Sequence, residues 1–286
     1  GVSGVVWECD LGLVEYKALI VTERTTFIGR VPLINFVTRF IDKLEAMQIA
    51  AESGADVVNA SFGFTRNREE GEETADYLKF LDPDGDGKKM ASVAASHEQV
   101  MDAAVADGRD VLWVLSAGND TIDVQYRSKG ELGMRDDVIV VANVEQDPSQ
   151  ASGVGRRATS NFGAQITVAA PGSDIVSTIP GDRYGYKSGT SMAAPLVSGL
   201  AALLLSANPD LSAPDLKACI SAGAANSGVR VEGHGFYVVN AAESRPSRRP
   251  KPNIAIRSSS APTRPPARSS RRASPLAPHR SPSSWR

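Results

Sequence analysis

Cysteine is scarce in this sequence, which holds Cys9 and Cys219 and no others in 286 residues. Two cysteines are too few for the disulfide framework of a small secreted domain, and neither stands in a metal-binding pattern. The sequence leaves open whether the two thiols pair with each other. A chain of this length with 42% hydrophobic residues can instead form a sizeable core.

Long hydrophobic runs are also missing. No apolar run reaches the roughly 20 residues that span a bilayer, and the longest candidate begins near Met192. We therefore expect a soluble chain with no membrane span. The sequence begins with Gly1 rather than Met, so a start codon and any signal peptide fall outside it, and the lack of a leader carries no information.

Acidic side chains are absent from residues 245–286, which hold eleven Arg or Lys, while the rest of the chain is acidic. Pro, Ser and Arg dominate this tail, and its few aliphatic residues cannot offset the entropy of ordering. We expect a folded domain over residues 1–244 and a disordered basic tail over residues 245–286.

Three interpretations of the tail stay open. It could be a flexible contact with nucleic acid or an anionic surface, a linker to a further domain, or a missense translation of a GC-rich reading frame. The tail lacks the interleaved aromatic residues of a single-strand binding platform, so a nucleic-acid partner is the least favoured.

Short runs rich in Val and Ile recur along the rest of the chain and predict strands. Continuous apolar runs of this kind are typical of parallel strands that are buried on both faces. Between them, residues 42–53 and 96–108 carry apolar residues at helical spacing. The alternation predicts a doubly wound α/β sheet, and the charged segment 65–89 reads as a surface insertion. The predicted strands lie at residues 16–21, 55–63, 110–119, 137–144 and 166–172.

Ser191 stands where a Gly-Thr pair meets a strongly apolar helix, in the run GTSMAAPLVSGLAALLLSANP. A hydroxyl at a helix N-terminus lies beside unpaired N–H groups and the positive end of the helix dipole, so a negative charge that develops there is stabilised. The simpler alternative is that Ser191 only caps the helix, as serine often does.

Residues Gly189 to Gly199 resemble the nucleophile signature G-T-S-M-A-x-P-x-V-[AS]-G of the subtilisin-like serine proteases, the subtilases of peptidase family S8. Four further segments resemble family motifs in the family's order, and the resemblance covers about residues 1–243. It implies a subtilisin-like α/β fold, a three-layer, doubly wound and mostly parallel sheet with helices on both faces. The four segments are ADVVNASFG, VLSAGND, VIVVANV and SNFGAQITVAAPGSDIVST.

The resemblance implies that Ser191 is the nucleophile and that Asn119 helps to stabilise the oxyanion. Acyl transfer passes through a tetrahedral oxyanion, and hydrogen-bond donors at that oxygen are usually the largest catalytic contribution. The Ser191 backbone N–H and the Asn119 side chain would supply them. The alternative for Asn119 is a turn residue that tolerates a left-handed backbone.

The same resemblance assigns two segments to the walls of a specificity pocket. An extended substrate would pair with the first segment as an added strand. The small residues of the second segment would leave room for a fairly large apolar side chain before the cut bond, although small residues also end buried strands wherever helices pack closely. The first segment is Ser61, Phe62 and Gly63, and the second is Ser116, Ala117 and Gly118.

The base that such a serine needs is missing from the sequence. Serine is activated by a His that an Asp orients, and in this family they lie in D-[ST]-G and H-G-T-H-x-A-G motifs upstream of the serine. Neither motif is present. His97 is expected to open an outer helix, His234 falls after the serine, and His279 lies in the tail, while Asp10 lacks the motif that should follow it. The expectation is an N-terminally truncated catalytic domain that is inactive by itself.

Acidic residues Asp82, Asp84 and Asp86 precede Gly87 and resemble the first half of a calcium loop. The twelfth position is Val93, so the bidentate Glu is absent, and a solvated acidic turn is the favoured interpretation. No cofactor is expected to be required. A structural calcium ion stays open because subtilases often bind one, and the sequence predicts no other metal site.

The sequence is compatible with two functions. The first is a monomeric serine endopeptidase that acts on polypeptides, of which this chain holds about the C-terminal two thirds of the catalytic domain. The second is a peptide-binding pseudoprotease that keeps the groove and lacks the base. The resemblance suggests a secreted or extracellular protein, and the sequence by itself leaves its location and its substrate unknown.

Overall fold

The computed structural model describes residues 27–28, 31–63 and 68–245, with side chains for residues 43–63 and 68–245. The chain divides into two units, Gly1–Ser247 and Arg248–Arg286, and every described residue lies in the first. The predicted strand at 16–21 and residues 246–286 of the basic tail fall outside the described residues, as do Cys9, Asp10 and His279.

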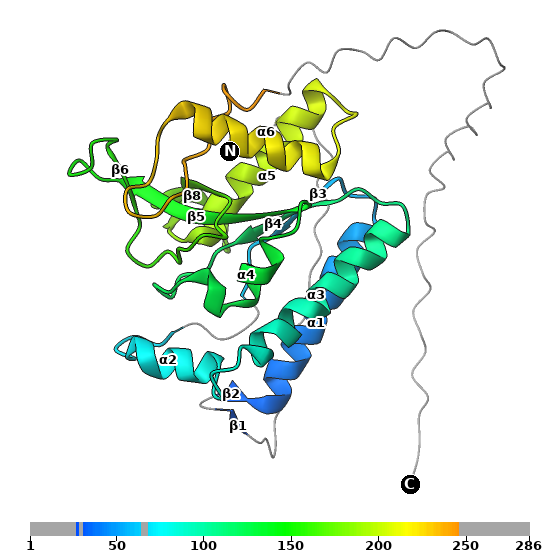
Figure 1. Cartoon of the computed structure of the whole chain (residues 1–286), viewed down its shortest axis with the longest axis vertical. Helices are drawn as coiled ribbons and strands as arrows, with labels where there is room; N and C mark the ends of the chain where they lie inside the picture. Colours follow the sequence, from blue (N-terminus) through cyan, green and yellow to red (C-terminus); the bar gives the residue numbers. More distant parts are fainter. Residues whose placement is uncertain (1–26, 29–30, 64–67, 246–286) are drawn as a thin grey trace, which may run out of the picture. The chain divides into compact units, whose positions relative to one another are not determined.

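A parallel sheet forms the centre of the described residues (Figure 1). β3 pairs with β4, β4 with β5, and β5 with β7, all in parallel, and β6 lies antiparallel beside the end of β5. β3 is therefore the edge of this sheet among the described strands. The strands are β3 (Val57–Ala60), β4 (Leu112–Ser116), β5 (Val138–Gln146), β6 (Val154–Arg156) and β7 (Val168–Pro171).

Helices cover both faces of the sheet, because alternate side chains of each strand point to opposite sides. Trp113 and Leu115 belong to a core cluster with α1 and α3, while Leu112 and Val114 pack in a second cluster with α5 and α6. All four side chains are at most 1% exposed. The helices are α1 (Leu33–Glu52), α3 (Lys88–Ala106), α5 (Thr190–Ala207) and α6 (Ala213–Ser227).

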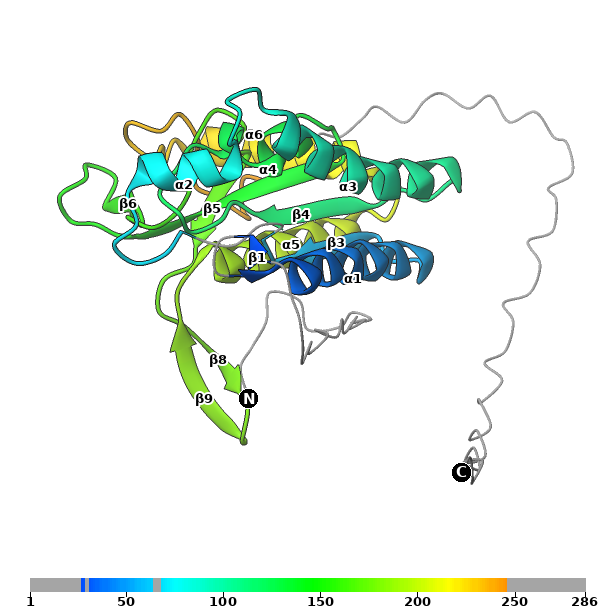
Figure 2. The same cartoon turned by 90° about the horizontal axis from the view of Figure 1, so that it is seen from below.

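The remaining elements are short. Figure 2 shows the β8–β9 hairpin extending away from the central sheet, and it leads into α5 at the Gly189–Ser191 turn. The elements are β1 (Phe27–Ile28), β2 (Val31–Pro32), α2 (Thr74–Leu81), the 3₁₀ helix η1 (Val124–Tyr126), α4 (Ser128–Leu132), β8 (Ile175–Ile179) and β9 (Arg183–Lys187).

The predicted α/β class is confirmed, and four of the five predicted strands correspond to β3, β4, β5 and β7. Two expectations were wrong in detail. α3 begins at Lys88, so His97 lies in the middle of that helix instead of opening it. The charged segment also contains α2, whose Tyr77 and Leu81 are fully buried beside Met90 and Ile122.

α5 is long and apolar enough to cross a bilayer by length and composition. In the fold it packs against β3, β4, β5 and β7. Ala193, Ala194, Val197 and Ala201 are fully buried in the core cluster on that face. The apolar composition of α5 therefore reflects its place as a core helix.

The burial of His97 predicts that the protein loses stability in acid. Its ring is buried, and this burial lowers the pKa of His97 from 6.5 to about 4, against a smaller opposite effect of its hydrogen bond to the Val93 carbonyl. Because the unfolded chain takes up this proton first, the stabilisation is complete above pH 6.5 and is lost as the pH falls toward 4. We expect the loss to be about 3 kcal/mol, measured by urea unfolding at several pH values.

The variant His97→Gln should remove this pH dependence and leave the contributions of the carboxylates unchanged. His234→Gln is the matched control, since His234 is only partly buried, and it should keep the acid-induced loss. The explanation is wrong if His97→Gln loses as much stability between pH 6.5 and 4 as the unchanged chain.

Candidate active site

The predicted site residues meet at the carboxyl ends of the parallel strands. Ser61 directly follows β3, and Ser116 ends β4 before the turn through Gly118. Ser191 lies in the first turn of α5, which crosses beneath the same strands. In open α/β sheets this edge is where ligands bind.

Ser191 does not cap its helix. Gly189 is the N-cap of α5, and no side chain forms a capping hydrogen bond there. The Ser191 Oγ donates instead to the Ser61 carbonyl over 3.1 Å. The Ser191 N–H is in the first helical turn, where backbone amides have no acceptor within the helix, so it can donate to an incoming group.

Thr190 connects the end of β4 to the start of α5. Its N–H donates to the Asn119 Oδ1 over 3.0 Å, and its hydroxyl donates to the same oxygen over 3.3 Å. The Thr190 Oγ1 also accepts the Gly118 N–H over 3.1 Å. Because both Thr190 donors hold the amide oxygen of Asn119, the Nδ2 group of Asn119 points away from Thr190 and keeps its donors for another partner.

Asn161 holds the Gly118–Asp120 turn from the other side. Its Oδ1 accepts the N–H groups of Asp120 and Ile122 over 2.9 and 3.2 Å, and its Nδ2 donates to the Ala117 carbonyl over 3.1 Å. Asn161 is fully buried. The sequence alone does not indicate this role of Asn161, although the residue stands in the SNFG segment that carries part of the family resemblance.

A buried ion pair lies directly behind Asn119. Asp120 and Arg127 are 1% and 3% exposed, and their side chains approach to 3.1 Å. The Arg127 guanidinium also donates to the Tyr77 hydroxyl of α2. Loss of one partner would leave an uncompensated buried charge, so this pair ties α2 and the turn together.

The backbone of Ser61–Gly63 presents its carbonyls in alternate directions. The Leu112 N–H donates to the Asp56 carbonyl, so even-numbered carbonyls of this strand face β4. The odd-numbered carbonyls face the opposite edge, which pairs with none of the described strands. The Phe62 carbonyl accordingly accepts from Lys129 over 3.1 Å. The Ser61 carbonyl accepts from Ser191, and the Gly63 carbonyl accepts from Lys43.

The two described histidines have other surroundings. His97 is buried within α3, and its Nδ1 lies 2.6 Å from the Val93 carbonyl. His234 receives a hydrogen bond from Arg156 over 3.0 Å, and its ring lies near Phe162 and Phe236. These contacts are compatible with a structural role for both histidines.

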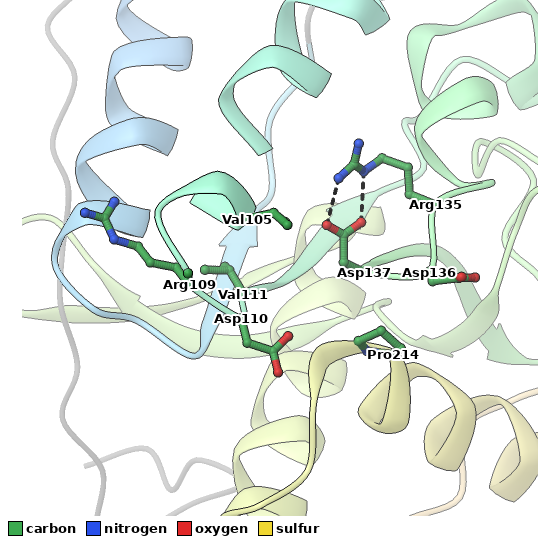
Figure 3. A pocket seen from close by; sticks show the side chains of 9 residues that line it. Val105, Arg109, Asp110, Val111, Arg135, Asp136, Asp137 and Pro214 are labelled. Carbon is green, nitrogen blue, oxygen red and sulfur yellow. Dashed lines mark hydrogen bonds and ion pairs between the residues drawn. The ribbon is translucent and has the colours of Figure 1, made fainter. Parts of the chain in front are cut away.

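Two hollows among the described residues lie away from Ser191. One, of about 490 Å³, is at the opposite ends of the strands, where Asp110 precedes β4 and Asp137 precedes β5. Figure 3 shows Arg135 joined to Asp137 in this hollow by two hydrogen bonds, both of 2.9 Å. The other, of about 500 Å³, is lined by His234 and its neighbours. Neither contains a residue of the predicted site.

The acidic turn after α2 uses its carboxylates within the turn. Asp82 accepts the N–H groups of Asp86 and Gly87 over 3.2 and 3.0 Å, and Asp86 pairs with Lys88. The bond from the Lys88 ammonium lowers the pKa of Asp86. Over residues 43–63 and 68–245 no group of three His, Cys, Asp or Glu side chains is arranged to hold a metal ion. The carboxylates of Asp82 and Asp86 thus already accept hydrogen bonds within the turn.

Residues 3–245 match the sequence profile of the subtilase family, and the chain belongs to this family. It is 31% identical to subtilisin DY of Bacillus licheniformis over 185 residues, which cover 65% of this chain and 55% of the relative. It is 35% identical to the thermophilic serine proteinase of Bacillus sp. (strain AK1) over 167 residues, 58% of this chain and 32% of the relative. The chain thus spans about half the length of the first relative and a third of the second.

A third relative is the halolysin-like extracellular serine protease Nep of Natrialba magadii, 34% identical over 46% of this chain and 22% of that protein. Among solved structures, a cold adapted subtilisin-like serine proteinase matches with a TM-score of 0.50 and 22% identity, covering 70% of this chain and 60% of that one. This likeness confirms the subtilisin-like fold.

The turn at Gly118 has no room for a larger residue, which predicts a loss of stability when Gly118 is replaced. Its φ of +106° disfavours other residues, and a Cβ placed there would lie 2.5 Å from the buried Asn161 Nδ2. Gly118→Ala should therefore lower the free energy of unfolding by about 3 kcal/mol, measured in urea. The matched control is Gly108→Ala, where φ is +73° and no atom lies within 4 Å of the added Cβ. The control should lose only about 1 kcal/mol, and equal losses would contradict the crowding at Asn161.

The acidic turn predicts a calcium-independent stability. Because Asp82 and Asp86 already accept backbone and lysine donors, we expect the same melting temperature in millimolar calcium and in EDTA. Thermal unfolding followed by circular dichroism measures this. If calcium raises the melting temperature and Asp82→Asn abolishes this increase, these carboxylates do bind the ion.

Proposed function

We propose that this chain contributes the nucleophile and the oxyanion donors of a serine-type endopeptidase, which hydrolyses peptide bonds through an acyl-enzyme on Ser191. The observation that carries the proposal is the coupling of Ser191 to Asn119 through Thr190, which fixes nucleophile and amide donor at the end of one helix. Family membership agrees with this chemistry.

The oxyanion would be held by two donors of different origin. One is the Ser191 N–H at the N-terminus of α5, where the helix dipole favours negative charge. The other is the Asn119 Nδ2, oriented because Thr190 occupies the amide oxygen. Removal of one such donor typically lowers kcat about 10²-fold to 10³-fold.

The substrate would lie along the edge of β3 that pairs with no described strand. The odd-numbered carbonyls of Ser61 and Gly63 face this edge, and the Ser191 hydroxyl already lies at the first of them. An extended peptide that pairs with the edge as an added strand would bring its backbone past Ser191. The segments Ser61–Gly63 and Ser116–Gly118 would then flank the side chain before the cut bond.

The general base is the part that this chain does not supply. The Ser191 Oγ donates to the Ser61 carbonyl, which cannot take up a proton at neutral pH, and the H-G-T-H and D-[ST]-G motifs are absent from the sequence. In subtilisin, loss of the base alone lowers kcat about 2 × 10⁶-fold. The chain by itself should therefore be nearly inactive.

A second candidate function is a peptide-binding pseudoprotease. The hydrogen bond from Ser191 to the Ser61 carbonyl favours it, since the serine then acts as a structural donor at the groove. The encoding DNA upstream of Gly1 distinguishes the two candidates. In-frame D-[ST]-G and H-G-T-H motifs favour the protease, and a start codon at this point favours the pseudoprotease.

A secreted location and polypeptide substrates are part of the proposal. The Natrialba magadii relative is named an extracellular serine protease, and the Bacillus sp. (strain AK1) relative is named a serine proteinase. Fractionation of the source culture into cells and medium, followed by immunoblotting, tests the location. Detection in the cells alone would overturn it.

The missing base predicts that a fluorophosphonate probe will leave Ser191 of this chain essentially unlabelled. The probe reacts with a serine whose proton a base removes, and here the hydroxyl donates to a carbonyl. Labelling is read by intact mass and by fluorescence in a gel, with subtilisin DY as the positive control and Ser191→Ala as the blank. Stoichiometric labelling of the chain that Ser191→Ala abolishes would show that a base is present after all.

A further inference from the structure

The walls of the proposed substrate cleft begin where the β3–β4 ladder stops. Ala60 pairs with Leu115, and this is the last residue pair of that ladder. The segments Ser61–Gly63 and Ser116–Gly118 follow directly. Some other contact must therefore set the distance between the two walls beyond this point.

Lys129 of α4 makes such a contact. Its Nζ donates to the Phe62 carbonyl of one wall over 3.1 Å and to the Ser116 carbonyl of the other. A third contact, to the Ser116 Oγ, is 3.4 Å long. The side chain is 1% exposed, and an ammonium group has three donors. The ammonium group thus donates to a backbone carbonyl of each wall.

We propose that Lys129 is a positioning residue of the substrate cleft: its ammonium group bridges the Phe62 and Ser116 carbonyls and sets the separation of the two walls. The role rests on the proposed function only in that these walls receive the peptide. The bridge itself is independent of any substrate.

Charged groups of several elements face this ammonium. Arg127 precedes α4, Asp120 follows β4, Lys43 lies on α1 and His97 on α3. Burial lowers the pKa of Lys129 to about 7, with a further lowering by Arg127 and an opposite, weaker effect of Asp120. The pKa of His97 is about 4, so its own titration lies well below that of Lys129.

Deprotonation would weaken the bridge. A neutral amine keeps only two N–H donors and loses the attraction between the positive charge and the carbonyl dipoles. The chemical shifts of the backbone amides in both walls should therefore change together as Lys129 loses its proton. A lysine that only fills space would produce no linked response at Phe62 and Ser116.

The test is an NMR titration of the full chain between about pH 5.5 and 9. We expect the Lys129 ¹³Cε signal and the backbone amides of both walls to shift with one midpoint near 7. Lys129→Met should abolish the inflection at both walls. The titration of the unchanged chain needs no variant, so the proposal stays testable if Lys129→Met fails to fold.

Lys217→Met is the matched control. Lys217 is also partly buried, and its Nζ donates to two carbonyls, those of Gly133 and Arg135 over 3.2 and 2.6 Å, away from the cleft. This variant should keep the linked inflection of the walls. An inflection at one wall only, or one that persists in Lys129→Met, would overturn the bridge.

A peptide-binding experiment distinguishes a failure of the Lys129 bridge from a failure of the proposed function. The probe is an N-acetylated tetrapeptide amide that ends in Phe, titrated against the unchanged chain and both lysine variants. Lys129→Met should weaken binding about fivefold to tenfold, while Lys217→Met should leave it unchanged. If no form binds the probe, the substrate cleft is wrong, and the linked titration still decides whether Lys129 bridges the walls.

Discussion

The hydrogen bonds of Thr190 are the constraint on which the geometry of the candidate site depends. The hydroxyl of Thr190 accepts from Gly118 and donates to Asn119, and its backbone N–H donates to the same amide oxygen. A valine has the same shape but could make neither side-chain contact. Because Thr190 directly precedes Ser191, these bonds fix the amide donor of Asn119 relative to the nucleophile.

The surrounding structure makes this arrangement rigid. The turn that carries Asn119 has Thr190 on one side and the buried Asn161 on the other, and no space for a Cβ remains at Gly118. α5 in turn is held by a core cluster on one face of the sheet. Sites on rigid helices and strands are positioned more accurately than sites on loops, and here β4 is fully buried and α5 is buried along one face.

The sequence predicted the parts of the fold that have a regular pattern. Apolar runs such as 110–119 and 137–144 became β4 and β5, since buried parallel strands need continuous apolar residues. The helix α2 within segment 65–89 was not predicted, because the dense charge of this segment gives no apolar pattern. Its Tyr77 and Leu81 are nevertheless buried on one side of α2. The roles of Lys129 and Asn161 depend on contacts with residues far away in the chain, and no local pattern encodes such contacts.

Two buried cations near the site are stabilised in different ways. Arginine keeps its charge in proteins, so a buried guanidinium requires a carboxylate, and Asp120 supplies one for Arg127. Lysine can instead release its proton, and the ammonium group of Lys129 donates to the Phe62 and Ser116 carbonyls. The arginine can therefore hold α2 and the turn at any physiological pH, whereas the lysine makes the contact between the two walls depend on protonation.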